Sequence, residues 1–89
     1  RNVELTGKVI NVYEVRHFEK GDRKGKVGNF LIGDETGVIR VVAWNDKADI
    51  LQKLSKGDII KIKSGYAREN RGRAEVHLGE KTKSVLERQ

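Results

Sequence analysis

Residues 27–44 read VGNFLIGDETGVIRVVAW, and this stretch decides the fold. Two runs rich in β-branched and aromatic residues, 27–33 and 38–44, flank the polar segment 34–37. An Asp at the start and a Gly at the end of a four-residue segment are typical of a tight turn. The stretch therefore predicts two antiparallel strands joined by a tight turn.

More strands are predicted on both sides of this hairpin. Residues 5–18 are rich in Val, Ile, Tyr and Phe and predict one long strand, with Gly7 at a bulge or bend. The polar and basic residues 19–26 predict a long hairpin loop. Toward the C-terminus, residues 59–66 and 73–78 predict two further strands. The polar residues from 79 onward carry no clear structural signal.

A single helix is predicted directly after the hairpin. The Asn-Asp pair at 45–46 is typical of a helix start, and apolar residues recur three positions apart at Ala48, Leu51 and Leu54. Gly57 is expected to end this helix with a left-handed cap.

Five short strands with one helix between the third and the fourth predict an all-β protein that closes into a small barrel. Closure removes the exposed strand edges that five open strands would present. From pattern alone the alternative is an SH3-like barrel, which is usually shorter and lacks such a helix.

The positive charge of the chain is concentrated. Its 89 residues carry a formal net charge of +6. Residues 16–26 hold five basic and two acidic side chains, and residues 67–73 hold three and one, so these two segments carry +5 of the total. They become neighbours in the five-stranded Greek-key barrel, the OB-fold, whose binding face is walled by the loops after strands 1 and 4. Two basic loops over a β surface are typical of a track for a phosphodiester backbone.

The floor of this track is predicted from the second strand of the hairpin. Side chains alternate along a strand, so Ile39, Val41 and Ala43 face the core, while Arg40 and Trp44 share the outer face. An indole beside a guanidinium suits base stacking together with phosphate neutralisation.

Two segments resemble the DNA-binding OB domains of replication protein A, the archaeal forms especially. They are GKVGNFLIGDETGVIRVVAWN at 25–45 and SGYARENRGRAEVHLG at 64–79. The resemblance covers about residues 5–79, and the run D-E-T-G-x-I-R-x-x-x-W-N is its most specific part.

The resemblance implies a basic residue on the third strand and a stacking aromatic four residues later, which Arg40 and Trp44 match. Other positions that it implies in the binding surface are Arg16, Phe18, Arg23 and Arg68. Many relatives carry a second stacking aromatic in or beyond the last hairpin, but residues 67–74 contain none. Tyr66 is the nearest substitute.

Several other classes of protein lack support. Without cysteine the chain has no disulfide, thiolate nucleophile or cysteine zinc site, and no apolar run approaches the ~18 residues of a membrane span. Residues 21–27 (GDRKGKV) do not form a phosphate loop, because one residue too few separates the two glycines and because the residue after the second lysine is not Ser or Thr. His17 and His77 lack metal-ligand spacing. We therefore predict that the protein is not an enzyme, that it binds no metal or cofactor, and that its partners include neither a membrane nor a small-molecule substrate.

The predicted function is sequence-independent single-stranded DNA binding in DNA replication, repair and recombination, of the replication protein A type. The alternatives are an RNA-binding OB module and an OB domain for protein interaction or oligomerisation. The predicted nucleic-acid-binding residues are Arg16, Phe18, Arg23, Lys24, Lys26, Arg40, Trp44, Tyr66, Arg68, Arg71 and Arg73.

Residues 1–89 are expected to form one OB domain, with a core at about 5–79 and a polar tail at 80–89. The domain is expected to come from a longer protein with several OB domains, which would be its partners beside single-stranded DNA. The expected location is intracellular: the cytoplasm or nucleoid if the source is archaeal, the nucleus if it is eukaryotic.

Overall fold

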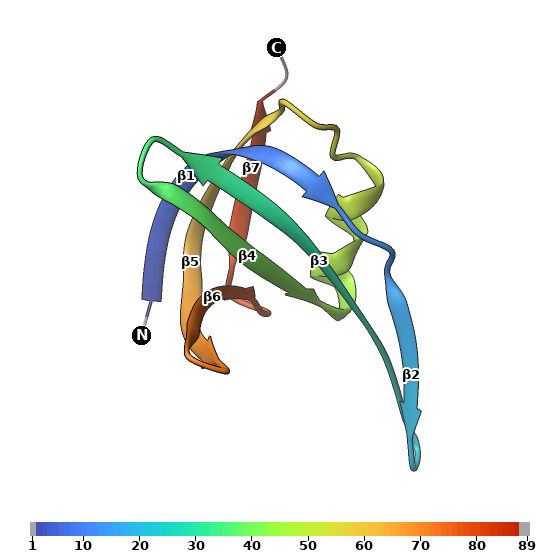
Figure 1. Cartoon of the computed structure of the whole chain (residues 1–89). Coiled ribbons are helices and arrows are strands. Elements are labelled where there is room, and N and C mark those ends of the chain that lie inside the picture. Colours follow the sequence, from blue (N-terminus) through green and yellow to red (C-terminus); the bar gives the residue numbers. More distant parts are fainter. Residues whose placement is uncertain (1, 88–89) are drawn as a thin grey trace.

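A computed structural model describes residues 2–87, which form seven strands and one 3₁₀ helix (Figure 1). In chain order the elements are β1 (Asn2–Val12), β2 (Arg16–Lys20), β3 (Arg23–Asp34), β4 (Gly37–Trp44), η1 (Asn45–Gln52), β5 (Ile59–Asn70), β6 (Arg73–Leu78) and β7 (Lys83–Glu87). No helix in this part of the chain is long and apolar enough to cross a membrane.

Five strands form a closed ring in the order β1-β3-β4-β6-β5, and β5 returns to pair with β1. Every pair in the ring is antiparallel except β4 with β6, which is parallel. The predicted small barrel is therefore confirmed. Its interior is apolar; the fully buried members of the core include Val9, Phe30, Ile32, Val41, Ala43, Ile60, Ile62 and Leu78.

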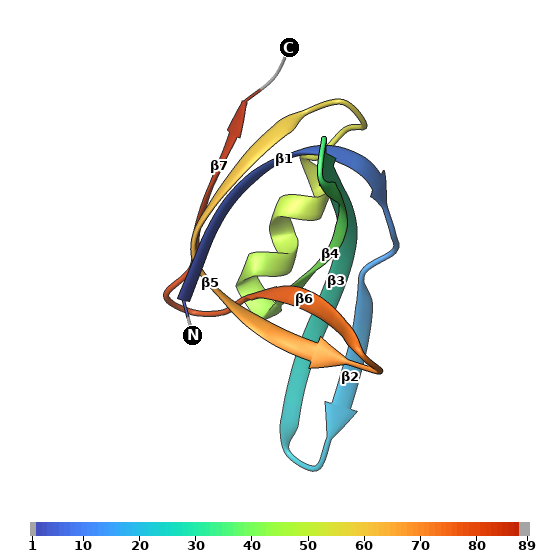
Figure 2. The ribbon, with the colours of Figure 1, turned by 60° about the vertical axis from the view of Figure 1, so that its left-hand side comes forward.

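The predicted helix is present, but it is a 3₁₀ helix that ends at Gln52. Figure 2 shows it across the opening of the ring. Its buried residues Ala48 and Leu51 are three apart, and a 3₁₀ helix places side chains at this spacing above one another. Leu51 packs over Gly28 of β3, where any side chain would collide with it.

The helix begins at the predicted pair, but Asn45 does not cap it with its side chain, and Gly57 does not end it. Asn45 has a φ of 53° and its side-chain oxygen accepts a hydrogen bond from the backbone N–H of Lys26, 3.3 Å away, instead of capping its own helix. The helix is followed by Lys53 in a right-handed conformation, while Gly57, with a φ of 93°, lies in the turn before β5.

The long strand predicted at 5–18 is two strands, because the chain leaves β1 after Val12 and starts β2 at Arg16. Gly7 marks a close approach to the side chain of Ile32 on β3 rather than a bulge. The register of β1 shifts on either side of this glycine, between Val3 and Leu5 and between Val9 and Asn11.

Both predicted basic loops are largely strand. β2 and β3 pair from Arg16 with Val27 to Lys20 with Arg23, which leaves only a two-residue turn between them. β5 likewise extends to Asn70, and Arg71 and Gly72, with φ values of 54° and 80°, make the turn to β6. A two-residue turn with positive φ at both central residues matches the twist of the two strands that it joins. The basic residues therefore lie on two β-hairpins.

The segment expected as a polar tail contributes β7, which the sequence did not predict. β7 pairs antiparallel with β5 outside the five-stranded ring, and residues 88–89 lie outside the described part. Thr82 anchors its start: the side chain is 2% exposed, donates to the carbonyl of Ser64 (2.9 Å) and accepts from the N–H of Gly79 (2.9 Å).

We expect Thr82→Val to lower the free energy of unfolding by about 1–3 kcal/mol, because it removes two hydrogen bonds of a buried hydroxyl, to the N–H of Gly79 and the carbonyl of Ser64, at nearly unchanged volume. Urea denaturation of the variant and the wild type measures this difference. Thr82→Ser keeps the hydroxyl and is the control. A Val variant as stable as the wild type would show that water replaces both bonds.

The turn between β3 and β4 has the predicted form, and the side chain of Asp34 closes it. The hydroxyl of Thr36 (2.5 Å) and its backbone N–H (2.7 Å) both donate to one carboxylate oxygen of Asp34. These bonds, the hydroxyl first, lower the pKa of Asp34 because they favour its charged form.

A carboxyl group whose pKa is lowered by folding stabilises the protein at pH values above its pKa in the unfolded state. This stabilisation is lost as the pH falls through the pKa of the folded state. We expect Thr36→Val to raise the pKa of Asp34 toward its ordinary value, since the hydroxyl bond is the largest cause of the shift. An NMR titration of the Asp34 carboxyl carbon measures it, with Thr36→Ser as the control. An unchanged pKa in Thr36→Val would refute this account of the turn.

Candidate nucleic-acid interface

The parallel pairing of β4 with β6 creates one continuous outer face. Arg40 lies opposite Glu75, and Val42 lies opposite His77. On the other side of β6, Tyr66 of β5 also lies opposite His77. Residues opposite each other in paired strands point to the same side of the sheet, so these side chains share the face that turns away from the core.

An aromatic row crosses this face. Phe18 meets Trp44 edge to face at a ring-centroid distance of 6.4 Å, and Trp44 lies nearly parallel to His77 at 6.1 Å. Tyr66 follows at 5.5 Å from His77. We call these four residues the aromatic row. It brings together the three predicted aromatic residues, and it adds His77, which the sequence analysis considered only as a metal ligand.

Phe18 reaches the row because β2 pairs with the first half of β3. It lies opposite Gly25, and any side chain at position 25 would overlap the phenyl ring. Arg16 lies opposite Val27, which in turn lies opposite Trp44, so Arg16 is on the same side of the sheet.

Trp44 is held by its indole N–H. The indole Nε1 donates a hydrogen bond to Nδ1 of His77 at 2.9 Å. The other ring nitrogen of His77, Nε2, lies 3.0 Å from a carboxylate oxygen of Glu75, whose second oxygen accepts from the side-chain amide of Asn70 at 3.3 Å. Glu75 and His77 are buried, at 8% and 6% exposure. This chain of side chains runs from the end of β4 to the tip of the β5–β6 hairpin.

Arg40 lies on the outer face of its strand, as predicted, and two contacts hold it there. Its guanidinium hydrogen-bonds to the side-chain oxygen of Asn29 and lies over the ring of Tyr13, 5.3 Å from the centroid. Tyr13, in the connection between β1 and β2, is exposed and was missed by the sequence analysis, because its place beside Arg40 depends on the pairing of three strands.

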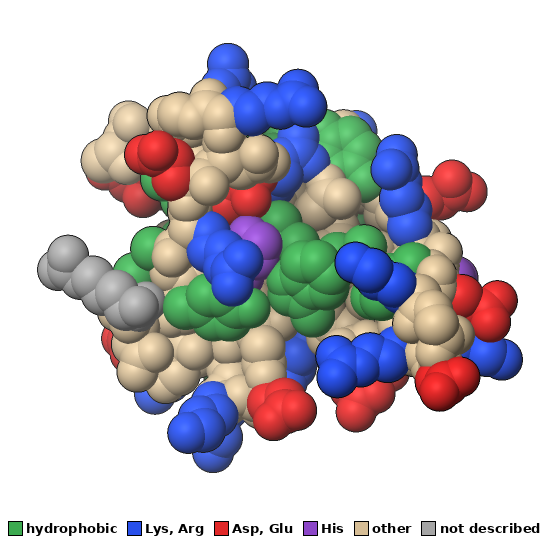
Figure 3. Space-filling view, turned by 90° about the horizontal axis from the view of Figure 1, so that it is seen from below, with side chains coloured by type: hydrophobic (Ala, Val, Ile, Leu, Met, Phe, Trp, Pro, Cys, Tyr) green, Lys and Arg blue, Asp and Glu red, His purple; other side chains and the backbone are tan. Residues whose placement is uncertain are grey.

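Basic side chains border the row on both sides. The β2–β3 hairpin carries Arg23 at its turn, and the β5–β6 hairpin carries Arg71 and Arg73. Arg68 lies over the ring of Tyr66, 5.5 Å from its centroid. Both hairpins project from the lower end of the molecule in Figure 1, and Figure 3 shows that end with hydrophobic side chains and a histidine between Lys and Arg side chains.

Two predicted residues lie elsewhere on the β2–β3 hairpin. Strand alternation puts Lys24 and Lys26 on the side opposite to Phe18. The ammonium group of Lys26 forms an ion pair with Asp49 of η1, and Lys24 lies opposite Glu19. Neither lysine therefore shares the side of the hairpin that carries Phe18 and Arg16.

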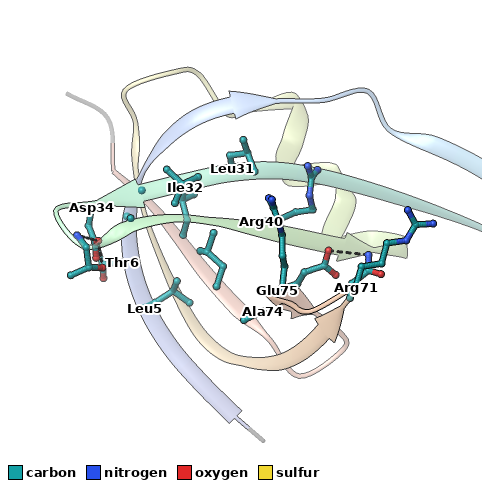
Figure 4. A pocket seen from close by; sticks show the side chains of 17 residues that line it. Leu5, Thr6, Leu31, Ile32, Asp34, Arg40, Arg71, Ala74 and Glu75 are labelled. Carbon is teal, nitrogen blue, oxygen red and sulfur yellow. Dashed lines mark hydrogen bonds between the residues drawn. The ribbon is translucent and has the colours of Figure 1, made fainter.

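A cleft of about 830 Å³ continues the face beyond Arg40 and Glu75 (Figure 4). It opens between the start of β4 and the β5–β6 hairpin. Leu5, Ile32 and Ala74 supply apolar lining, and Arg71 lies at its rim. The cleft and the aromatic row thus form one surface with arginines along it.

Comparison with known proteins identifies the fold and the family. The family model tRNA_anti-codon, described as an OB-fold nucleic acid binding domain, matches residues 3–83. The chain belongs to this family. The OB-fold predicted from the sequence is therefore confirmed.

A separate observation concerns metal ions: within residues 2–87 no group of three or more His, Asp or Glu side chains could hold one.

Two curated relatives of this OB domain are archaeal. It is 40% identical over 77 residues to replication factor A of Methanothermobacter thermautotrophicus, which covers 83% of this chain and 10% of that protein. It is 24% identical over 82 residues to the single-stranded DNA binding protein Ssb of Saccharolobus solfataricus, which covers 92% of this chain and 53% of that protein. The chain thus spans about a tenth of the length of the first relative and about half of the length of the second.

Solved structures agree. The replication factor A related protein from Methanobacterium thermoautotrophicum has a TM-score of 0.79 at 34% identity, covering 93% of this chain and 77% of that one. The second OB-fold domain of replication protein A from Methanococcus maripaludis has a TM-score of 0.75 at 27% identity, covering 90% and 80%. The resemblance to archaeal replication protein A domains is therefore confirmed.

Proposed function

We propose that this OB domain binds single-stranded DNA without sequence preference, as one unit of a longer protein that acts in DNA replication, repair and recombination. The observation that carries the proposal is the aromatic row between two arginine-bearing hairpins. Bases stack on aromatic rings irrespective of sequence, and arginines neutralise the phosphates beside them. A curated relative named as a single-stranded DNA binding protein supports the same reading.

In the proposed complex Trp44 stacks on one base and Tyr66 on a neighbouring one. The structure favours Tyr66 as the second stacking residue, because it continues the row through His77 and its ring is already paired with Arg68. Few stacking positions make a single domain a weak binder, and further OB domains in the same chain or complex would raise the affinity through effective concentration.

We expect Trp44→Ala to weaken binding of oligo-dT by about 5- to 150-fold, since one base–aromatic stack contributes about 1–3 kcal/mol, a range for which replication protein A is itself a reference case. Titration of a fluorescent oligo-dT measures the affinity, and circular dichroism confirms that the variant is folded. Trp44→Phe, which keeps an aromatic face, should lose less. A folded Ala variant with wild-type affinity would remove Trp44 from the binding surface.

We expect binding to weaken with salt, with a log–log slope of about −2 to −3 for three or four phosphate contacts. Arg68→Ala should reduce the magnitude of the slope by about 0.7, the value of one contact to a single strand. Lys26→Ala should change it less, because Asp49 already pairs with that ammonium group. Titrations of the same oligo-dT at several salt concentrations give these slopes.

Lys56→Ala is the matched control for these slopes. Lys56 is exposed in the turn between η1 and β5, at the upper end of Figure 1, away from both hairpins. A slope near zero for the wild type, or an equal change with Lys56→Ala and Arg68→Ala, would contradict the proposed phosphate contacts.

Competition of oligo-dT with oligo-U and with a duplex of the same sequence tests the choice of nucleic acid. Tighter binding of oligo-U would assign the surface to RNA, whose 2′-hydroxyl is the feature that separates the two. Absence of binding to all three, with self-association in sedimentation, would favour an interaction domain instead.

A further inference from the structure

The series of side-chain hydrogen bonds from Trp44 through His77 and Glu75 to Asn70 determines which atom carries each proton. Tryptophan can only donate through its indole N–H, so Nδ1 of His77 must accept and carry a free electron pair. In a neutral imidazole the other nitrogen then carries the proton, so Nε2–H donates to the carboxylate of Glu75. The ionised carboxylate accepts this bond and the one from Asn70. The indole N–H, both imidazole nitrogens and both carboxylate oxygens each have a partner in this one arrangement.

Protonation of His77 is incompatible with this arrangement. It would place a hydrogen on Nδ1, pointing at the indole N–H of Trp44 across 2.9 Å, so that two donors would face each other. The imidazole is buried between Trp44 and Tyr66, so it has little room to turn away. The bond that holds the indole and the charge on the imidazole therefore exclude each other.

We propose that His77 is the positioning residue of Trp44: neutral His77 orients the indole for base stacking, and protonation releases it. The inference rests on the proposed function, because it assigns to His77 the placement of the stacking ring. His77 itself need not touch the nucleic acid, since it acts through the hydrogen bond to Nε1.

The charged groups around His77 are known on each strand that packs against it. Glu75 on its own strand faces Nε2 of His77. Arg40 on β4 and Arg68 on β5 both lie opposite Glu75. Tyr66 on β5 contributes an uncharged ring. The groups that face His77 are thus one carboxylate, with an arginine opposite it on each neighbouring strand, and the indole N–H.

Trp44 is the single tryptophan and His77 one of two histidines, which makes the test direct. We expect the indole N–H resonance of the free protein to shift on acidification, together with the ring nitrogens of His77. His17→Asn removes the exposed histidine of β2 and should leave this titration unchanged. An indole resonance that does not move, or that moves only with His17, would overturn the proposal.

Two variants at position 77 separate the acceptor from the packing. Asn and Leu have similar shapes, and both lose the Nε2–H bond to Glu75, but only Asn keeps an acceptor near the position of Nδ1. We expect His77→Asn to bind oligo-dT more tightly than His77→Leu at pH 8, by about two- to tenfold, the usual net value of one hydrogen bond. Equal affinities of the two folded variants would overturn the positioning role.

The pH dependence of binding completes the test. The affinity of the wild type for oligo-dT should fall by about two- to tenfold between pH 8 and pH 5, the same value of one hydrogen bond. The affinity of His77→Asn should fall less. A wild-type affinity that is constant or rises on acidification would overturn the proposal. If the wild type binds no oligo-dT at any pH, the proposed function fails, while the ligand-free titration of the indole still decides whether His77 holds Trp44.

Discussion

The parallel pairing of β4 with β6 is the contact on which the rest of the molecule depends. It closes the ring of five strands, and it is the only parallel pair within that ring. Residues more than thirty positions apart in sequence thereby become neighbours, so that Trp44 meets His77 and Arg40 lies opposite Glu75. Without this closure the two basic hairpins would have no common face between them.

This closure also explains why a carboxylate lies inside a basic surface. Glu75 is buried between two arginine-bearing strands and accepts bonds from His77 and Asn70. A buried charge without partners is strongly destabilising, whereas a fully bonded one is tolerated. Within residues 2–87 every buried side-chain polar atom has a hydrogen-bond partner. The side chains at the centre of this surface are thus held by contacts within the protein itself.

Local patterns predicted the elements that depend on neighbours in sequence. The turn closed by Asp34, the alternation that puts Arg40 and Trp44 outside, and the strand at 73–78 are all present. The patterns failed where a distant contact decides the conformation. Asn45 bonds to β3 instead of capping its helix, and β7 forms because β5 offers it an edge. Neither effect leaves a periodic signal in its own segment.

The sequence by itself determined a closed β barrel with one helix, the family resemblance, and the concentration of positive charge on two segments, because periodicity, turn residues and charge are local properties. Only the tertiary structure decided which side chains share a surface. It added Tyr13 and His77 to the candidate interface, turned Lys24 and Lys26 to the other side of their hairpin, and joined Tyr66 to the aromatic row. Strand register makes those choices, and register is set by the closure of the whole ring.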